Sequence, residues 1–464
     1  MDDPGACGSS VAPAPASPDE REPLRARWRP ALEQVAAGAA PGEVLAGWLR
    51  AERSDFVRFN HGRVRQAGSV ERAILELRLI AGGRQARHAV TLCGDPATDR
   101  ARVAAGTDRL REAIRVAEPD PFLSFSETPG HSLRIAPARL ASIDELAQTV
   151  CDSARGADLV GFHAGGPLAC AMVSSLGHDH WHEAASWSLE YSVFEGAGDR
   201  ALKRCVCGTD WASEAVRNDI AASLRDAQIL RRPARRLDPG AHRCYLSPRA
   251  LADLVEMLAW GGFSARAQMT GQSPLARLRS GESAFDPRVS IAEDLFAASA
   301  PLFQSDGYAR PGHLELVRDG RYGASLVSPR SAREFSLPDN GAASQESPEA
   351  LSVAPGTLDE AQALARLGTG LAVSNLWYLN FSDRQHCRVT GMTRFATLWV
   401  EGGEPVAPVE PMRFDDSLYR VLGSSLEALT ARAHRMPDTS SYDGRSFGST
   451  SAPGALLGEL SFTL

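Results

Sequence analysis

Residues 374–403 read SNLWYLNFSDRQHCRVTGMTRFATLWVEGG and carry a dense group of polar side chains between two apolar runs. Folding alone does not require so many polar groups in one short segment, since burial of apolar surface is the main stabilising term. The polar side chains are therefore candidates for a binding role. They are Asn375, Asn380, Asp383, Arg384, His386, Cys387, Arg388, Thr390, Thr393 and Arg394.

The two halves of this segment predict different local structures. Residues 394–400 combine large apolar side chains with the β-branched Thr397, which is typical of a strand, and EGGEP at 401–405 is typical of the turn that ends it. We therefore predict that residues 380–391 form a loop that leads into the strand. Loops on a rigid scaffold are common places for binding groups. The alternative is a solvated hairpin in which Asp383 and Arg384 pair with their neighbours.

The composition is that of an ordinary globular protein. A chain of 464 residues can bury a large core and predicts two or three domains. The formal net charge of -7 provides no basic field for phosphates, so we expect no nucleic-acid partner. No window approaches the roughly 18 consecutive apolar residues of a membrane-spanning helix, and we expect no membrane partner.

The location of the protein is predicted from its N-terminus and its cysteines. The first residues, Met1-Asp2-Asp3-Pro4, are acidic where a secretory signal would be basic. The eight cysteines are dilute over this length, and Cys205 and Cys207 lack the spacing of a CxxC pair. They indicate free thiols in a reducing compartment, and we expect a cytoplasmic protein.

The order of expected elements is segregated rather than an alternation of strand and helix, which indicates an α+β fold. Residues 1–22 have few large apolar side chains, which predicts a flexible tail. An N-terminal domain is expected over 23–235 and a β-rich C-terminal domain over 236–464. The basic stretch 231–236 is interpreted as the solvated connection between them.

Four helical regions and several strands are expected within these domains. The helices are predicted over 25–53, from the capping box at Ser142 to about Ala154, over 213–230, and from Ser247-Pro248 onward. The strands are predicted over 56–94 with a turn at Gly82-Gly83, over 159–162 and 168–173 as a hairpin around Gly165-Gly166, and over 178–194 as a strand pair or one extended strand.

The polar segment takes part in a family resemblance. Together with Arg330-Ser331-Ala332-Arg333-Glu334-Phe335 and Asn340-Gly341-Ala342, it resembles the TldD/PmbA family, also described as modulators of gyrase and as metallopeptidase-related proteins. The likeness extends over most of the chain, to residues 56–60 with Gly62 and the strand 74–80, to 174–177 and to 303–307. It is specific in the C-terminal half and weaker before about residue 170. The resemblance implies a two-domain fold with an N-terminal α/β sandwich-type domain and a C-terminal β-rich domain.

The resemblance also implies which metal chemistry this chain lacks. The family's catalytic signature is a helical HExxxH, in which two histidines hold zinc and the glutamate activates a bound water. The matching positions here are Val255, Glu256 and Trp260, so the glutamate is kept and neither histidine is. The family's C-terminal metal-binding cysteine is absent too, because no cysteine follows Cys387 and the matching segment is 446–458. The chain thus resembles the metal-lacking PmbA (TldE) branch.

Three hypotheses follow for the function. By the resemblance, the chain is a metal-free subunit whose zinc-bearing, HExxxH-containing TldD-like partner, or a second copy of itself, completes a dimeric peptidase for unfolded or leader peptides. A second hypothesis is a self-sufficient homodimeric hydrolase that uses His178, His180 and His182, or His386 and Cys387. A third is a non-catalytic protein that binds peptides.

Candidate residues are assigned under each hypothesis. The substrate-binding candidates are Arg330, Arg333, Asn375, Asn380, Asp383, Arg384, Arg388, Thr390 and Arg394. Their arginines suit peptide carboxylates, with internal salt bridges to Glu334, Asp383 and Glu401 as the alternative. His178, His180 and His182 share a strand face and are a weak metal candidate, with a polar groove as the preferred interpretation. Glu256 is a weak catalytic candidate and is interpreted as a helix-surface residue, Trp260 as filling the space of a zinc ligand, and Cys387 as a buried structural thiol.

Overall fold

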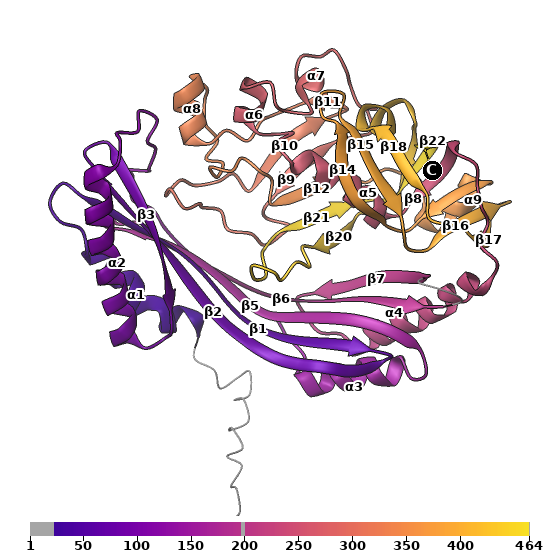
Figure 1. Ribbon diagram of the computed structural model, residues 1–464, viewed down its shortest axis with the longest axis horizontal. Helices are drawn as coiled ribbons and strands as arrows, with labels where there is room; N and C mark the ends of the chain where they lie inside the picture. Colours follow the sequence, from indigo (N-terminus) through magenta and orange to yellow (C-terminus); the bar gives the residue numbers. More distant parts are fainter. Residues whose placement is uncertain (1–22, 196–199, 464) are drawn as a thin grey trace, which may run out of the picture.

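The computed structural model describes residues 23–195 and 200–463. Its first sheet is a long, strongly curved layer of seven strands in the order β3-β2-β1-β5-β6-β4, with β7 paired to β6 (Figure 1). The strands are β1 (Val44–Asn60), β2 (Arg63–Ala81), β3 (Arg84–Leu92), β4 (His131–Ala136), β5 (Asp158–Ser174), β6 (Asp179–Phe194) and β7 (Ala201–Gly208). The helices are α1 (Leu24–Ala37), α2 (Pro96–Val116), α3 (Ile143–Ser153) and α4 (Ser213–Asp226), with a 3-10 turn η2 (Ala227–Arg231).

The two faces of this sheet serve different purposes, because successive side chains of a strand point to opposite faces. On β1, the side chains of Leu45, Leu49 and Ala51 belong to the core beneath α1 and α2. The intervening Trp48, Arg50 and Glu52 point to the concave face. The helices thus cover the convex face, and the C-terminal half of the chain lies in the concavity (Figure 1).

The C-terminal half contains two further sheets. One has the order β11-β10-β9-β12-β21-β20, and the other has the order β14-β15-β18-β22-β8-β13-β16-β17 with β19 paired to β22. The strands of the first are β9 (Ile291–Asp294), β10 (His313–Arg318), β11 (Arg321–Tyr322), β12 (Ala350–Val353), β20 (His434–Pro437) and β21 (Ser449–Ala452). Those of the second are β8 (Gly240–Leu246), β13 (Gly370–Val373), β14 (Leu376–Asp383), β15 (Arg388–Thr393), β16 (Thr397–Glu401), β17 (Glu404–Pro408), β18 (Arg413–Ser417), β19 (Leu426–Leu429) and β22 (Ala455–Phe462).

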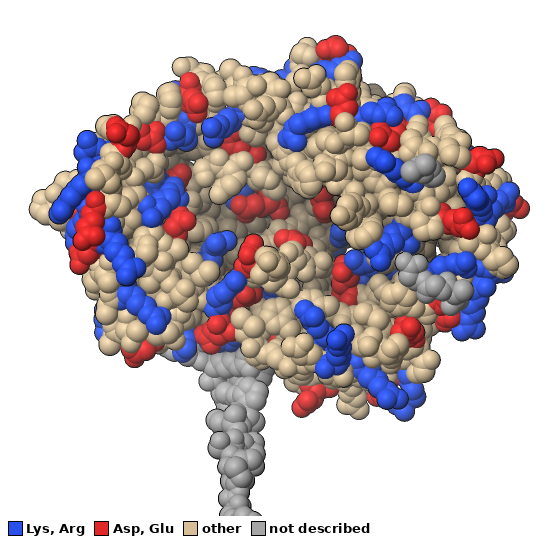
Figure 2. Space-filling model, in the orientation of Figure 1, with Lys and Arg blue, Asp and Glu red and all other residues tan. Residues whose placement is uncertain are grey.

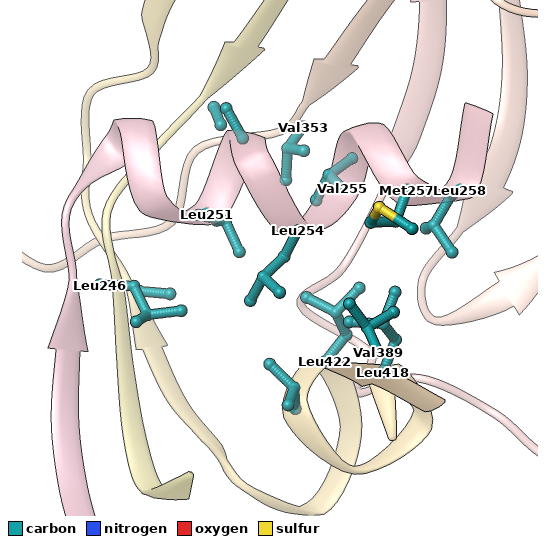
Figure 3. Packing of buried hydrophobic residues seen from close by; sticks show 14 of the residues in the cluster. Leu246, Leu251, Leu254, Val255, Met257, Leu258, Val353, Val389, Leu418 and Leu422 are labelled. Carbon is teal, nitrogen blue, oxygen red and sulfur yellow. The ribbon is translucent and has the colours of Figure 1, made fainter. Parts of the chain in front are cut away.

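Helix α5 (Pro248–Glu256) lies at the centre of this half. Leu254 and Val255 are fully buried, with Val353 of β12 on one side and Leu418 and Leu422 on the other (Figure 3). The helix therefore joins the cores of the two sheets. The shorter helical elements are η3 (Met257–Ala259), α6 (Ala265–Met269), α7 (Ala276–Arg279), α8 (Pro329–Phe335), η4 (Glu360–Gln362), α9 (Ala363–Leu367) and a π turn η5 (Arg420–Ser424).

Mixed helices and sheets in a two-domain arrangement confirm the expected α+β class, and both predicted serine caps are confirmed. The Ser142 hydroxyl accepts a hydrogen bond from the Glu145 amide at the start of α3. The Ser247 hydroxyl accepts one from the Ala250 amide at the start of α5, where proline occupies the first turn. A side-chain oxygen at this position satisfies one of the amide groups that a helix start leaves free.

Three predictions of local structure are wrong. Residues 44–53 belong to β1 and not to a helix, because the helix of the region ends at Ala37. Residues 158–174 form one strand and not a hairpin, and Gly166 lets it pass β1 so closely that a Cβ there would lie 2.0 Å from the Arg53 carbonyl oxygen. The third concerns residues 380–391, where the hairpin alternative is correct and the loop is not: β14 and β15 pair on either side of a turn at 384–387.

Strand β6 is the single extended strand that was one of the two alternatives predicted for residues 178–194. Helix α2 was not predicted. Within the described ranges 23–195 and 200–463, no helix has the length and apolar character needed to cross a membrane. The tail predicted over 1–22 lies outside the described residues.

Candidate functional site

A cavity of about 760 Å³ lies between the concave face of the first sheet and the C-terminal half. Strands β1, β2 and β5 form one wall, and α5, β12, β21 and the connection between β20 and β21 form the other. The visible face of the molecule is hollowed at its centre, where acidic and basic side chains reach inward (Figure 2). The size is that of a small-ligand or peptide-segment site.

The sheet side of the cavity is built by alternate residues of β1. Trp48, Arg50 and Glu52 are two residues apart and share one face. Ile74 of β2 and Cys170 of β5 lie beside Arg50 in the strand register and also line the cavity. Burial raises the pKa of the Cys170 thiol well above its usual range, so this neighbour of Arg50 is neutral.

The connection between β20 and β21 is fixed to the first sheet by Arg445. Its guanidinium donates to the Gly166 carbonyl (2.9 Å) and to the Ser54 hydroxyl (3.2 Å). It also donates to the carbonyl and the hydroxyl of Ser186, both at 2.8 Å. The Arg445 amide donates to the carboxylate of Glu52 (3.1 Å), and burial lowers the pKa of the guanidinium to about 10. This wall of the cavity thus depends on contacts between the two halves of the chain.

Glu256 is the last residue of α5 and its side chain lines the cavity. Burial raises the pKa of its carboxyl, while a hydrogen bond with Thr450 of β21 and the charge of Arg249 counteract the shift. Arg249 is itself bound to Asp253, at 2.8 Å, and the other oxygen of Asp253 accepts the Leu376 amide. Glu256 is therefore a cavity residue, and its interpretation as a helix-surface residue is corrected.

The residues around Glu256 do not fit a zinc site. Val255 is fully buried in the apolar core of the C-terminal half. Trp260 follows η3 and is 53% exposed. The prediction that it fills the space of a missing zinc ligand is therefore wrong. Neither side chain offers a metal ligand. In the part of the chain that the structure describes, no three His, Cys, Asp or Glu side chains are grouped so that they could share a metal ion.

The three histidines of the weak metal alternative lie at the start of β6, but each contacts a different oxygen of the protein. The contacts join His178 Nδ1 to Ser174 Oγ (2.7 Å), His180 Nδ1 to Ser132 Oγ (2.8 Å) and His182 Nε2 to Ser299 O (2.9 Å). Burial lowers the pKa of all three, and that of His182 to about 4. They are neutral side chains that join segments of the fold.

The arginines proposed for substrate binding make contacts within the chain. These contacts join Arg330 to Asp120 (2.6 Å), Arg333 to the Leu123 carbonyl, Arg384 to the carbonyls of Trp260 and Gln272, Arg388 to Asp415 (2.5 Å) and Arg394 to the Trp377 ring, 4.1 Å from its centre. Internal pairing was the alternative for these residues, although the partners differ from those expected. Arg330 and Arg333 connect α8 to the segment after α2.

The other substrate-binding candidates lie on the β14–β15 hairpin or next to it, and none of them lines the cavity. Asn375 is 7% exposed, Asn380 accepts the Phe381 amide, Asp383 pairs with His386, and Thr390 donates to the Phe414 carbonyl. Cys387 is fully buried, and burial raises the pKa of its thiol to about 12, so it is no thiolate nucleophile at neutral pH.

Apart from Glu256, the residues described above as building the cavity were not identified from the sequence. Arg50 and Glu52 alternate with the buried Leu49 and Ala51, which is the period of a strand, but this stretch was assigned to a helix. Arg445 lies in a connection without a regular pattern, and its partners are more than 250 residues away in sequence. The alternation on β1 was the signal that could have identified part of the site.

Comparison with known proteins gives a consistent assignment for this geometry. Residues 239–464 match the family model described as the PmbA/TldA metallopeptidase C-terminal domain. No curated protein matches the sequence. Among solved structures, the chain is similar to TldE from Thermococcus kodakarensis, with a TM-score of 0.75 at 13% identity over 91% of this chain and 97% of that one.

Two further solved structures share the fold. A proposed modulator of a DNA gyrase from Thermotoga maritima gives a TM-score of 0.71 at 16% identity, over 91% of this chain and 96% of that one. A proposed modulator of DNA gyrase from Bacteroides thetaiotaomicron gives 0.71 at 13% identity, over 95% and 98%. At these identities the likeness establishes the arrangement of the elements and not a shared activity.

Proposed function

This chain belongs to the TldD/PmbA family through its C-terminal domain, and we propose that it is the metal-lacking, TldE-like subunit of a dimeric cytoplasmic peptidase. In this proposal its cavity binds an unfolded or leader peptide. The zinc belongs to a TldD-like partner that carries HExxxH.

The observation that carries the proposal is the surroundings of Glu256. Its carboxyl faces the cavity, as a residue that meets substrate must, but Val255 before it is enclosed in the core. A carboxylate without a metal-bound water beside it lacks the proton donor that zinc hydrolysis uses. Glu256 can still accept a hydrogen bond from a bound chain, because its side chain lines the cavity.

The competing hydrolase hypothesis finds no support in the geometry. The histidines of β6 are engaged with Ser174, Ser132 and Ser299, and Cys387 is a buried thiol. A nucleophile needs access to substrate and an adjacent base. Peptide binding without hydrolysis is compatible with the same cavity, and it is what the proposed subunit would do in isolation.

The test uses the intact purified chain, alone and mixed with a family member that contains HExxxH. Zinc content, mass in solution and hydrolysis of an unfolded peptide are measured on each sample. We expect the chain alone to hold no stoichiometric zinc and to be inactive, and the mixture to form a dimer whose activity a chelator abolishes. Stoichiometric zinc with hydrolysis by the chain alone would overturn the proposal.

A matched pair of variants separates the two glutamates of such a dimer. Glu256→Gln in this chain should leave the zinc content of the mixture unchanged, whereas the same substitution in the partner's HExxxH should abolish hydrolysis. A binding assay with the unfolded peptide shows whether this chain contributes to affinity. Loss of zinc from the dimer on Glu256→Gln would contradict the assignment of the metal to the partner.

A further inference from the structure

We propose that the cavity recognises a carboxylate on the bound peptide and that Arg50 of β1 is the residue that binds it. This inference rests on the proposed function, in which the cavity receives a peptide. It adds a chemical requirement for the substrate, which is a C-terminal carboxylate or the side chain of an acidic residue.

Arg50 lies in the middle of the sheet wall of the cavity. Ile74 and Cys170 flank it in the register, and Trp48 and Glu52 precede and follow it on the same face. The backbone at Arg50 is fixed on both sides, because β1 pairs with β2 and with β5 along this stretch. Its side chain is exposed to the cavity. Within residues 23–195 and 200–463 it has no hydrogen bond, ion pair or ring contact.

The remaining arginines of the cavity wall are already occupied. Their partners are Glu52 for Arg72 (3.4 Å), Glu76 for Arg87 (2.6 Å), Asp253 for Arg249 (2.8 Å), Glu293 and Glu349 for Arg310 (2.9 and 3.0 Å), and Ser54, Gly166 and Ser186 for Arg445. The same contacts engage Glu52, Glu76 and Glu349, which are three of the acidic side chains that line the cavity. The guanidinium of Arg50 is thus available for an anion that the protein does not supply.

One buried donor of the C-terminal half, next to the β1 wall, also lacks an acceptor. Gln304 is 3% exposed, and its amide nitrogen has no hydrogen-bond partner, while its amide oxygen accepts the Asp306 amide at 2.5 Å. Phe303 beside it packs against Trp48, with ring centres 5.8 Å apart, so this segment adjoins the β1 wall near Arg50. This nitrogen is enclosed by protein atoms and out of reach of a ligand in the cavity, so the proposed carboxylate is bound by Arg50 and not by Gln304.

The chemistry of a guanidinium selects the ligand. Its planar set of N–H groups matches a carboxylate in two parallel hydrogen bonds, and its charge is permanent. The neutral Cys170 thiol does not compete for it. A peptide provides such a carboxylate either at its C-terminus or on an aspartate or glutamate. Both sources satisfy the same site, so they are distinguished by experiment.

The test measures binding of four labelled peptides of one unfolded sequence to the full chain by fluorescence anisotropy. The peptides have a free or an amidated C-terminus, each with one internal Glu or with Gln in its place. Charged hydrogen bonds of this kind correspond to roughly a tenfold or larger change in Kd. We expect one of the two neutralising changes to weaken binding by at least that factor, which identifies the source.

Variants connect the effect to Arg50. Arg50→Gln should bind all four peptides as weakly as the wild type binds a peptide that lacks the recognised carboxylate. Arg65→Gln is the matched control, because Arg65 is an exposed arginine of β2 outside the cavity. It should keep the wild-type preference. Since Arg50 has no partner in the described chain, its substitution should leave the denaturation midpoint unchanged, so that lost binding is not lost folding.

The outcomes are separable. If the wild type binds all four peptides equally, or if Arg50→Gln keeps the preference, the carboxylate inference is overturned while peptide binding stands. If the wild type binds none of the peptides, with or without an HExxxH-containing family member present, the proposed function fails and the inference falls with it.

Discussion

Replacing Arg445 by Met removes the guanidinium that fixes one wall of the cavity to the first sheet. Methionine keeps the length and the apolar stem of the side chain but cannot donate hydrogen bonds. The substitution leaves the carbonyls of Gly166 and Ser186 without their donors and Glu52 with less positive charge nearby. We expect the connection between β20 and β21 to detach from β1, β5 and β6.

The magnitude follows from opposing contributions. Hydrogen bonds from a charged donor contribute about 1.5–3 kcal/mol each, and breaking a fully buried charged pair costs about 3–5 kcal/mol. Burial of the guanidinium opposes this, as its lowered pKa of about 10 indicates. Arg72 still contacts the Asp443 carbonyl and keeps part of the connection in place. We therefore expect the free energy of unfolding to fall by about 2–3 kcal/mol.

Two assays separate local from global loss. Urea denaturation measures the free energy of unfolding. Limited chymotrypsin digestion measures opening of the connection, because Tyr442 lies within it and is 95% exposed. A local destabilisation of 2–3 kcal/mol corresponds to cleavage after Tyr442 that is roughly 30- to 150-fold faster, when opening is rapid compared with cleavage.

The control is Arg432→Met, which removes an exposed arginine of the same region whose side chain has no contact in the described structure. It should change neither quantity. Arg445→Lys should recover only part of the stability, because an ammonium group cannot reproduce the planar arrangement of the guanidinium N–H groups. If Arg445→Met has the same free energy of unfolding and the same cleavage rate after Tyr442 as the wild type, the anchoring role of Arg445 is refuted.

Two further predictions concern the cores. Burial lowers the pKa of His182 to about 4, below the value of about 6.5 expected in the unfolded chain, so the unfolded chain takes up the proton first as the pH falls. Its contribution to stability is complete above pH 6.5 and falls by about 2 kcal/mol between pH 6.5 and 5. His182→Asn should remove this loss from the pH dependence of the unfolding free energy measured in urea. The same dependence on pH in both proteins would contradict the prediction. Leu254→Ala should lower the free energy of unfolding by about 3 kcal/mol, because the side chain is fully buried between two sheets. Met269→Ala is the control and should lower it by under about 0.5 kcal/mol, because that side chain is 42% exposed. Similar effects of the two substitutions would contradict the central position of α5.

Local chemistry made some features predictable. The caps at Ser142 and Ser247 depend on hydrogen bonds within three residues, so the sequence alone identifies them. The turn at Gly82-Gly83 joins β2 and β3, and both glycines have positive φ, which favours glycine over other residues. Such features need no information about distant parts of the chain.

Long-range pairing explains most of the wrong predictions. The apolar spacing of residues 44–53 is compatible with a helix, but pairing with β2 on one side and β5 on the other makes it a central strand. Residues 380–391 are likewise committed to β14 and β15 by pairing that continues into β18. The polar side chains of this segment belong to a hairpin with one solvated face and internal ion pairs.

The position of Glu256 illustrates why the candidate site could be located only in part. The family signature directed attention to the end of α5, but the surroundings of its carboxyl come from β21, almost 200 residues later, and from the sheet that closes the cavity. The same helix turn places Val255 in the core, so the residue beside the glutamate has become part of the packing between two sheets. A helix that uses this position for packing cannot also present a ligand there. What α5 still offers the cavity is a carboxyl whose pKa burial raises, which suits contact with a bound chain. This division within one turn is the reason why we propose that a partner holds the metal.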